Sequence, residues 1–141
     1  MKKVLVLCTG NSCRSQMAHG YLNKFKKCKA EIYSAGIETH GVNQKAIEIM
    51  KLDGIDIRHH TSNNVNEYAT VDFDYIITVC DNAKESCSHF PSTALQFHYN
   101  FNDPAKVKGT EEEIQQEFIE VRDTIKQYIE RFCKMYLNEY Q

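Results

Sequence analysis

A cysteine and an arginine separated by five residues stand near the start of the chain, and this spacing suits the capture of an anion. The segment follows an apolar run and precedes a helical pattern, so its backbone N–H groups can converge on one point in front of a helix dipole. Arg14 can present two donors to a tetrahedral anion, with Cys8 beneath the central atom. The residues predicted to surround the anion are Cys8, Thr9, Gly10, Asn11, Ser12, Cys13, Arg14 and Ser15.

The same donors would stabilise a thiolate on Cys8. A cysteine with a pKa of about 8.5 is about 3% ionised at pH 7, and lowering the pKa to about 6 would raise this to roughly 90%. Gly10 and Asn11 tolerate the left-handed backbone that a tight loop needs. Cys8 could instead be an inert thiol at a strand end. The coincidence of Cys, Gly, Asn, Arg and Ser in one turn favours a nucleophile.

A second pair of cysteines, Cys80 and Cys87, follows an apolar run later in the chain. If the segment between them is helical, their Cα atoms lie about 10 Å apart, whereas a disulfide tolerates at most about 7 Å. They can therefore bond only if the segment unwinds. Both could also be ordinary structural thiols. Their spacing does not match the usual zinc ligand patterns, and we expect no metal there.

An Asp-Pro pair, Asp103-Pro104, occupies a stretch without strand or helix pattern. Proline favours an extended conformation for the residue before it and stiffens the loop, which suits a carboxyl group directed into a site. Read by itself, Asp-Pro is more often simple turn chemistry.

The elements that must position these groups alternate between strand and helix patterns. Strands are predicted at 3–7, 31–34, 73–79 and 95–98, with a weaker candidate near Ile57. Helices are predicted at 15–27, 43–52 and 64–69, and a long final helix begins with a capping box of Thr110 and Glu113. This order predicts an α/β fold with a parallel sheet covered by helices, whose ligands bind at the carboxyl ends of the strands.

Length and composition set the class of protein. At 141 residues the chain is expected to form a single domain, 1–141. A net charge of −2 provides no broad basic face, so nucleic acid is not an expected partner. The apolar start is too short for a signal peptide or membrane span, which predicts a cytoplasmic protein with no membrane partner. Six cysteines in such a protein are expected to be reduced thiols.

The loop from Cys8 to Ser15 resembles the Cys-x5-Arg-Ser signature of the low-molecular-weight protein tyrosine phosphatases and of the thioredoxin-coupled arsenate reductases built on the same fold. The resemblance extends over nearly the whole chain. It implies a three-layer fold with a four-stranded parallel sheet flanked by helices. It also implies Cys8 as nucleophile, Arg14 as oxyanion clamp and Asp103 as general acid, with Asn11 and Ser15 supporting the loop.

Cys80 and Cys87 resemble the redox segment of the arsenate reductases. The implied reaction reduces arsenate to arsenite: Cys8 attacks arsenic, Cys80 attacks Cys8, Cys87 attacks Cys80, and thioredoxin reduces the final disulfide. Reducing the oxyanion takes two thiols, and passing the oxidation outward takes a third. Some of these reductases bind potassium, but His19 and Asn63 stand where carboxylates are expected. We therefore expect no metal and no other cofactor.

Two alternatives stay open. One is a tyrosine phosphatase using Cys8, Arg14 and Asp103, with some phosphatase activity expected in either case. The other is a redox-responsive protein that binds an oxyanion without turnover. The remaining histidines form no evident metal or catalytic pattern. These are His40, His59, His60, His89 and His98.

Overall fold

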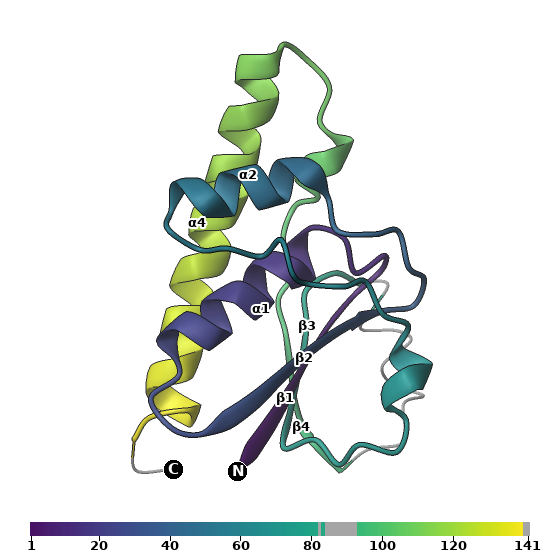
Figure 1. Cartoon of the computed structure of the whole chain (residues 1–141), viewed down its shortest axis with the longest axis vertical. Helices are drawn as coiled ribbons and strands as arrows, with labels where there is room; N and C mark the ends of the chain where they lie inside the picture. The colour runs from purple at the N-terminus through teal and green to yellow at the C-terminus, as the bar shows by residue number, and fades with distance from the viewer. Residues whose placement is uncertain (82, 84–92, 140–141) are drawn as a thin grey trace.

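The structure, a computed structural model of the chain, describes residues 1–81, 83 and 93–139 (Figure 1). Four strands form one sheet: β1 (Lys2–Cys8), β2 (Ala30–Gly36), β3 (Tyr75–Thr78) and β4 (Leu95–His98). Their order is β2-β1-β3-β4, and each neighbouring pair is parallel. The predicted α/β fold with a four-stranded parallel sheet is confirmed.

Burial explains the order of the strands. Val4 to Leu7 of β1 and all of β3 are buried, as expected for central parallel strands covered on both faces. The strands β2 and β4 lie at the edges and are only partly buried, and Leu95 of β4 is exposed. The most apolar runs of the sequence therefore occupy the centre of the sheet.

The helices cover the sheet (Figure 1). On one side lie α1 (Arg14–Phe25) and α4 (Glu111–Tyr136), which pack on each other, and α2 (Gln44–Leu52) also contacts α4. The short 3-10 helix η1 (Val65–Tyr68) lies on the opposite side. The predicted capping box of α4 is present: the Thr110 hydroxyl accepts a hydrogen bond from the Glu113 N–H, and the Glu113 carboxylate accepts one from the Thr110 N–H.

Two local predictions differ from the structure. The weaker strand near Ile57 is absent. Ile57 instead lies fully buried at the start of a turn, and its carbonyl accepts a hydrogen bond from the His60 N–H. One buried side chain in a turn gives the same apolar signal as a short strand. The helix predicted at 64–69 is a single 3-10 turn capped by Asn64.

The parallel register brings four strand ends to one edge of the sheet. Cys8 pairs with Gly36, Leu7 with Thr78, and Thr78 with His98. The segments that follow these strands therefore meet there, as they do in open α/β sheets that bind ligands. Within the described residues, no helix has the length and apolar character needed to cross a membrane.

Candidate active site

The loop between β1 and α1 wraps around the start of the helix. Asn11 adopts a left-handed conformation with φ of 47°, one of the few residue types that does so readily. Cys13 precedes the helix and its side chain makes no capping hydrogen bond. Cys13 thus does not occupy the first N–H groups of α1, one of which, on Ser15, is directed at Cys8, and the helix dipole favours a negative group here.

Hydrogen bonds within the loop, from the start of α1 and from the segment at residues 62–63 hold this loop in shape. The Asn11 amide donates to the Ser15 hydroxyl at 2.8 Å and accepts from the Asn63 N–H at 2.8 Å. Gln16 donates to the Asn11 carbonyl at 3.0 Å, and the Ser62 hydroxyl donates to the Gly10 carbonyl at 3.1 Å. Gln16 and Ser62 carried no signal in the sequence, because polar residues outside a motif resemble any surface residue.

Arg14 is held beside Asp103 before any anion binds. Its Nη1 donates to the Phe101 carbonyl at 2.9 Å, and its Nη2 lies 3.6 Å from a carboxylate oxygen of Asp103. The Nε of Arg14 is buried and has no hydrogen-bond partner among the described residues. A buried donor without a partner is costly, so this nitrogen is available to an oxyanion.

Asp103 is oriented by the turn that follows it. Its carboxylate accepts from the Ala105 N–H at 3.0 Å, and Pro104 begins the 3-10 helix η2 (Pro104–Lys106). The Asp-Pro pair is therefore a local cap and also places a carboxyl group at the oxyanion loop. The two readings of this pair are compatible.

A cavity of about 120 Å³ lies over the loop and brings together groups distant in sequence. It is lined by Cys8, Gly10, Ser12, Cys13, Arg14, His40, Asp103 and Ala105. Cys8, Arg14 and Asp103 thus share one cavity whose size suits a small tetrahedral anion. Burial raises the pKa of Cys13 to about 12, so this thiol stays protonated. Cys13 therefore contributes to the loop through its backbone and not through its sulfur.

Cys80 reaches the same loop from the end of β3. Its sulfur lies 3.1 Å from the Thr9 hydroxyl, and it is buried. Hydrogen bonding with Cys80 and burial raise the pKa of Cys8, against the charge of Arg14 and the Ser15 N–H. Hydrogen bonds with Cys8 and Thr9 lower the pKa of Cys80.

The two sulfurs therefore lie against each other at the loop, and their shared hydrogen bond makes Cys80 the more acidic of the pair. The expectation that the loop donors stabilise a Cys8 thiolate did not include this contact, because the sequence gives no sign that a second thiol lies against Cys8. Cys87, the third predicted cysteine, lies outside the described residues.

The potassium ligands that the resemblance implied do not fit here. The Ser34 hydroxyl is hydrogen-bonded to His19 Nδ1 at 2.8 Å, and Asn63 supplies an amide in place of a carboxylate. The rings of His19 and His60 pack with centroids 4.4 Å apart. Imidazoles thus stand where a hard cation would favour charged oxygens. Among the described residues, no group of three or more His, Cys, Asp or Glu side chains could hold a metal ion.

Acidic pH is expected to destabilise the protein through His19 and His60. Burial lowers the pKa of His19 to about 3 and that of His60 to about 4. Below about pH 6.5 the unfolded chain binds protons that the folded protein excludes, so stability falls as the pH drops. The slope for His19 is up to about 1.4 kcal/mol per pH unit, and partly solvated His60 contributes less.

This pH dependence is measurable by urea unfolding at pH 7.5, 6.0 and 5.0. A variant with glutamine at both positions should lose less stability over this range than the natural protein. Identical slopes for the two proteins would contradict the assignment.

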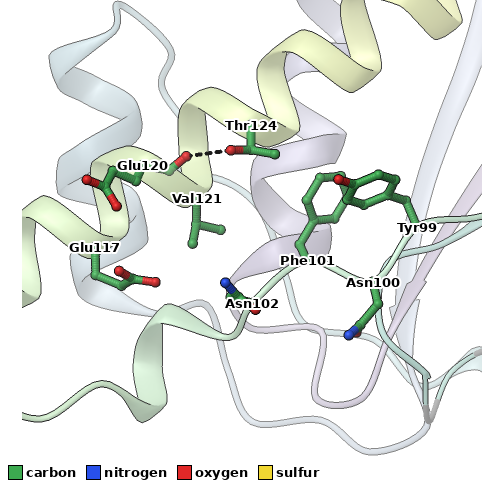
Figure 2. A pocket seen from close by; sticks show the side chains of 8 residues that line it. All are labelled: Tyr99, Asn100, Phe101, Asn102, Glu117, Glu120, Val121 and Thr124. Atoms are coloured by element: carbon green, nitrogen blue, oxygen red, sulfur yellow. Dashed lines mark hydrogen bonds between the residues drawn. The ribbon is translucent and has the colours of Figure 1, made fainter.

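A second, larger cavity of about 340 Å³ lies between the segment before Asp103 and α4. Figure 2 shows the rings of Tyr99 and Phe101 side by side at one end, with Glu117 and Glu120 of α4 at the other. The two rings lie 4.6 Å apart, and both pack on Tyr128 of α4. This stack fixes the backbone of Phe101, whose carbonyl holds Arg14.

Comparisons with known proteins agree with this arrangement. The family described as low molecular weight phosphotyrosine protein phosphatase matches residues 3–141. An arsenate reductase of Halalkalibacterium halodurans is 44% identical over 133 residues, which cover 94% of this chain and 96% of the relative. Arsenate reductase 1 of Staphylococcus epidermidis is 45% identical over 132 residues, with the same coverage of both chains.

Solved structures share the fold. An arsenate reductase in a phosphate binding state superposes with a TM-score of 0.74 at 29% identity, covering 96% of this chain and 98% of that one. A low molecular weight protein tyrosine phosphatase from T. tengcongensis gives a TM-score of 0.82 at 24% identity, covering 96% and 99%. The second likeness shows the fold alone.

Proposed function

Because the chain belongs to the low molecular weight phosphotyrosine protein phosphatase family, we propose that it uses the family's oxyanion loop to reduce arsenate to arsenite. The observation that carries this proposal is the position of Cys80, whose sulfur lies beside Thr9 and Cys8 at the loop. Phosphate ester hydrolysis needs one thiol, whereas reduction of an oxyanion needs a second within reach of the first. The names of the curated relatives support the same choice.

In the first step Cys8 bonds to arsenic. The Cys8 thiol and H₂AsO₄⁻ give two products: the As(V) adduct Cys8–S–AsO₃H⁻ and one water. Arg14 and the loop N–H groups stabilise the charge on the arsenate oxygens, and Asp103 protonates the leaving oxygen. The proton that Cys8 releases returns to Asp103, so the overall charge stays at −1.

In the second step Cys80 attacks the Cys8 sulfur. The S–As bond breaks, arsenic leaves with its electron pair as H₂AsO₃⁻, and the Cys80 proton goes to the departing arsenite. Arsenic gains two electrons and the two sulfurs lose two as a disulfide forms. Cys87 then attacks Cys80, which returns Cys8 as a thiol and leaves a Cys80–Cys87 disulfide. A thioredoxin dithiol reduces that bond and becomes a disulfide itself. Since this reductant works in the cytoplasm, we place the protein there as well.

The rival function is hydrolysis of phosphotyrosine. An aromatic substrate would favour aromatic side chains at the mouth of the catalytic cavity, but Tyr99 and Phe101 pack on Tyr128 and line the other cavity. Ala105, the side chain directly after the Asp-Pro pair, is the one that lines the catalytic cavity. A minor phosphatase activity is still expected, because the cradle accepts phosphate and arsenate alike. An oxyanion-binding protein without turnover would not need Cys80 at the loop.

The deciding experiment combines the protein with arsenate, thioredoxin, thioredoxin reductase and NADPH. Arsenate-dependent NADPH consumption should exceed the rate of aryl phosphate hydrolysis by at least tenfold at equal enzyme concentration. A faster hydrolysis, with no arsenate-dependent NADPH consumption, would assign the protein to the phosphatases. Absence of both activities, with phosphate binding retained, would identify a binding protein.

A further inference from the structure

His98, which the sequence left unassigned, connects the ends of three segments at the edge of the sheet. Its Nε2 lies 2.9 Å from the Asp81 carboxylate and its Nδ1 lies 2.7 Å from the Thr78 hydroxyl. A carboxylate only accepts hydrogen bonds, so His98 Nε2 must carry the hydrogen whatever the charge of the ring. Thr78 is buried at the end of β3, which gives the imidazole a fixed anchor.

This connection lies directly beside the second thiol. Asp81 follows Cys80 in the chain, and Cys80 is held on its other side by the Thr9 hydroxyl at 3.1 Å. The Asp81 side chain is largely exposed, so its hydrogen bond with His98 adds little to folding stability. Its effect is geometric, because it fixes the direction in which the chain leaves β3.

We propose that His98 is a positioning residue for the disulfide-forming step: by holding Asp81 it keeps the Cys80 sulfur against Thr9 and Cys8. The inference rests on the proposed reduction, in which Cys80 must attack Cys8 along the axis of the S–As bond. Without the hydrogen bond between His98 and Asp81, the Asp81 backbone and the Cys80 sulfur adopt more orientations. A smaller fraction of these orientations allows Cys80 to attack Cys8. The capture of the anion does not involve His98 and should not change.

The test uses Cys87→Ser protein, in which the reaction stops at the Cys8–Cys80 disulfide. The rate of disulfide formation after addition of arsenate is followed by iodoacetamide quenching and peptide mass spectrometry. His98→Ala and Asp81→Ala should each slow this step at least tenfold. Asp81→Asn should stay within about threefold of the parent, because its amide oxygen still accepts from His98.

Two further measurements separate positioning from a general structural effect. The double variant His98→Ala/Asp81→Ala should be no slower than either single variant, because both remove the same contact. Protection of Cys8 from iodoacetamide by inorganic phosphate should keep its half-saturating concentration within twofold. Asp56→Ala, which removes an exposed carboxylate paired with Arg58, is the matched control and should match the parent.

Each remaining outcome is decisive. Disulfide formation within twofold of the parent in both alanine variants would overturn the inference and leave the proposed reduction intact. Parallel loss of phosphate protection would assign His98 a structural role instead. Failure of the Cys87→Ser parent itself to form the disulfide would overturn the proposed reduction, and the inference with it.

Discussion

Replacing Cys80 by serine is expected to abolish thioredoxin-coupled arsenate reduction, with a fall of at least 10³-fold in NADPH consumption. Serine keeps the hydrogen bond to Thr9 but cannot form a disulfide with Cys8, so arsenic has no route to arsenite. Binding of phosphate at the loop should persist, because the loop N–H groups and Arg14 remain. Phosphate protection of Cys8 from alkylation measures that binding.

Two other cysteines give the controls for this experiment. Cys28→Ser replaces a partly exposed thiol after α1 and should keep turnover within twofold. Cys87→Ser should release at most one arsenite per protein, because the Cys8–Cys80 disulfide then has no internal thiol to resolve it. Sustained turnover by either Cys80→Ser or Cys87→Ser would refute the thiol relay.

Replacing Gly36 by alanine is expected to lower oxyanion binding and turnover at least 100-fold. A Cβ at this position would lie directly against the Glu38 carbonyl, 2.7 Å from the Asn11 nitrogen and 2.8 Å from the Thr9 carbonyl. All three are backbone atoms, so the clash can be relieved only by moving both the segment after β2 and the oxyanion loop, to which Asn11 and Thr9 belong. The displaced N–H groups would no longer converge on one point.

The comparison for Gly36 is Gly20→Ala, in the middle of α1. The added methyl there meets side chains only, the movable end of Met50 and the Cγ2 methyls of Ile55 and Ile57, and alanine favours the helix. Activity should stay within threefold of the natural protein, as measured by arsenate-dependent NADPH consumption. If Gly36→Ala bound phosphate as tightly as Gly20→Ala, the proposed contact between β2 and the loop would have no functional weight.

The parts of the fold that depend on residues close together in the chain could be predicted. The apolar run that became β1, the Thr110 and Glu113 cap of α4 and the turn between Cys8 and Arg14 each depend on residues close together in the chain. The position of Asp103 beside Arg14 followed only from the family resemblance, because 89 residues separate them and no local rule brings them together.

Other parts of the site depend on contacts across the sheet and could not be read from residue types. The carbonyl of Phe101 holds Arg14, but a backbone acceptor has no sequence signature. Gly36 is required for close approach of two backbones, which becomes visible only once β2 is placed beside the loop. His98 resembled any other histidine until the register placed it beside Thr78.

The hydrogen bond from Arg14 to Phe101 has a consequence for the thermodynamics of anion capture. A free arginine side chain loses about 2 kcal/mol of rotamer entropy when it is immobilised. Here the guanidinium is already ordered by the Phe101 carbonyl and the Asp103 carboxylate, so that loss accompanies folding and not association. An entropy difference of about 2 kcal/mol corresponds to roughly thirtyfold in affinity. Calorimetry of phosphate binding should therefore show a smaller unfavourable entropy than a site with a mobile arginine.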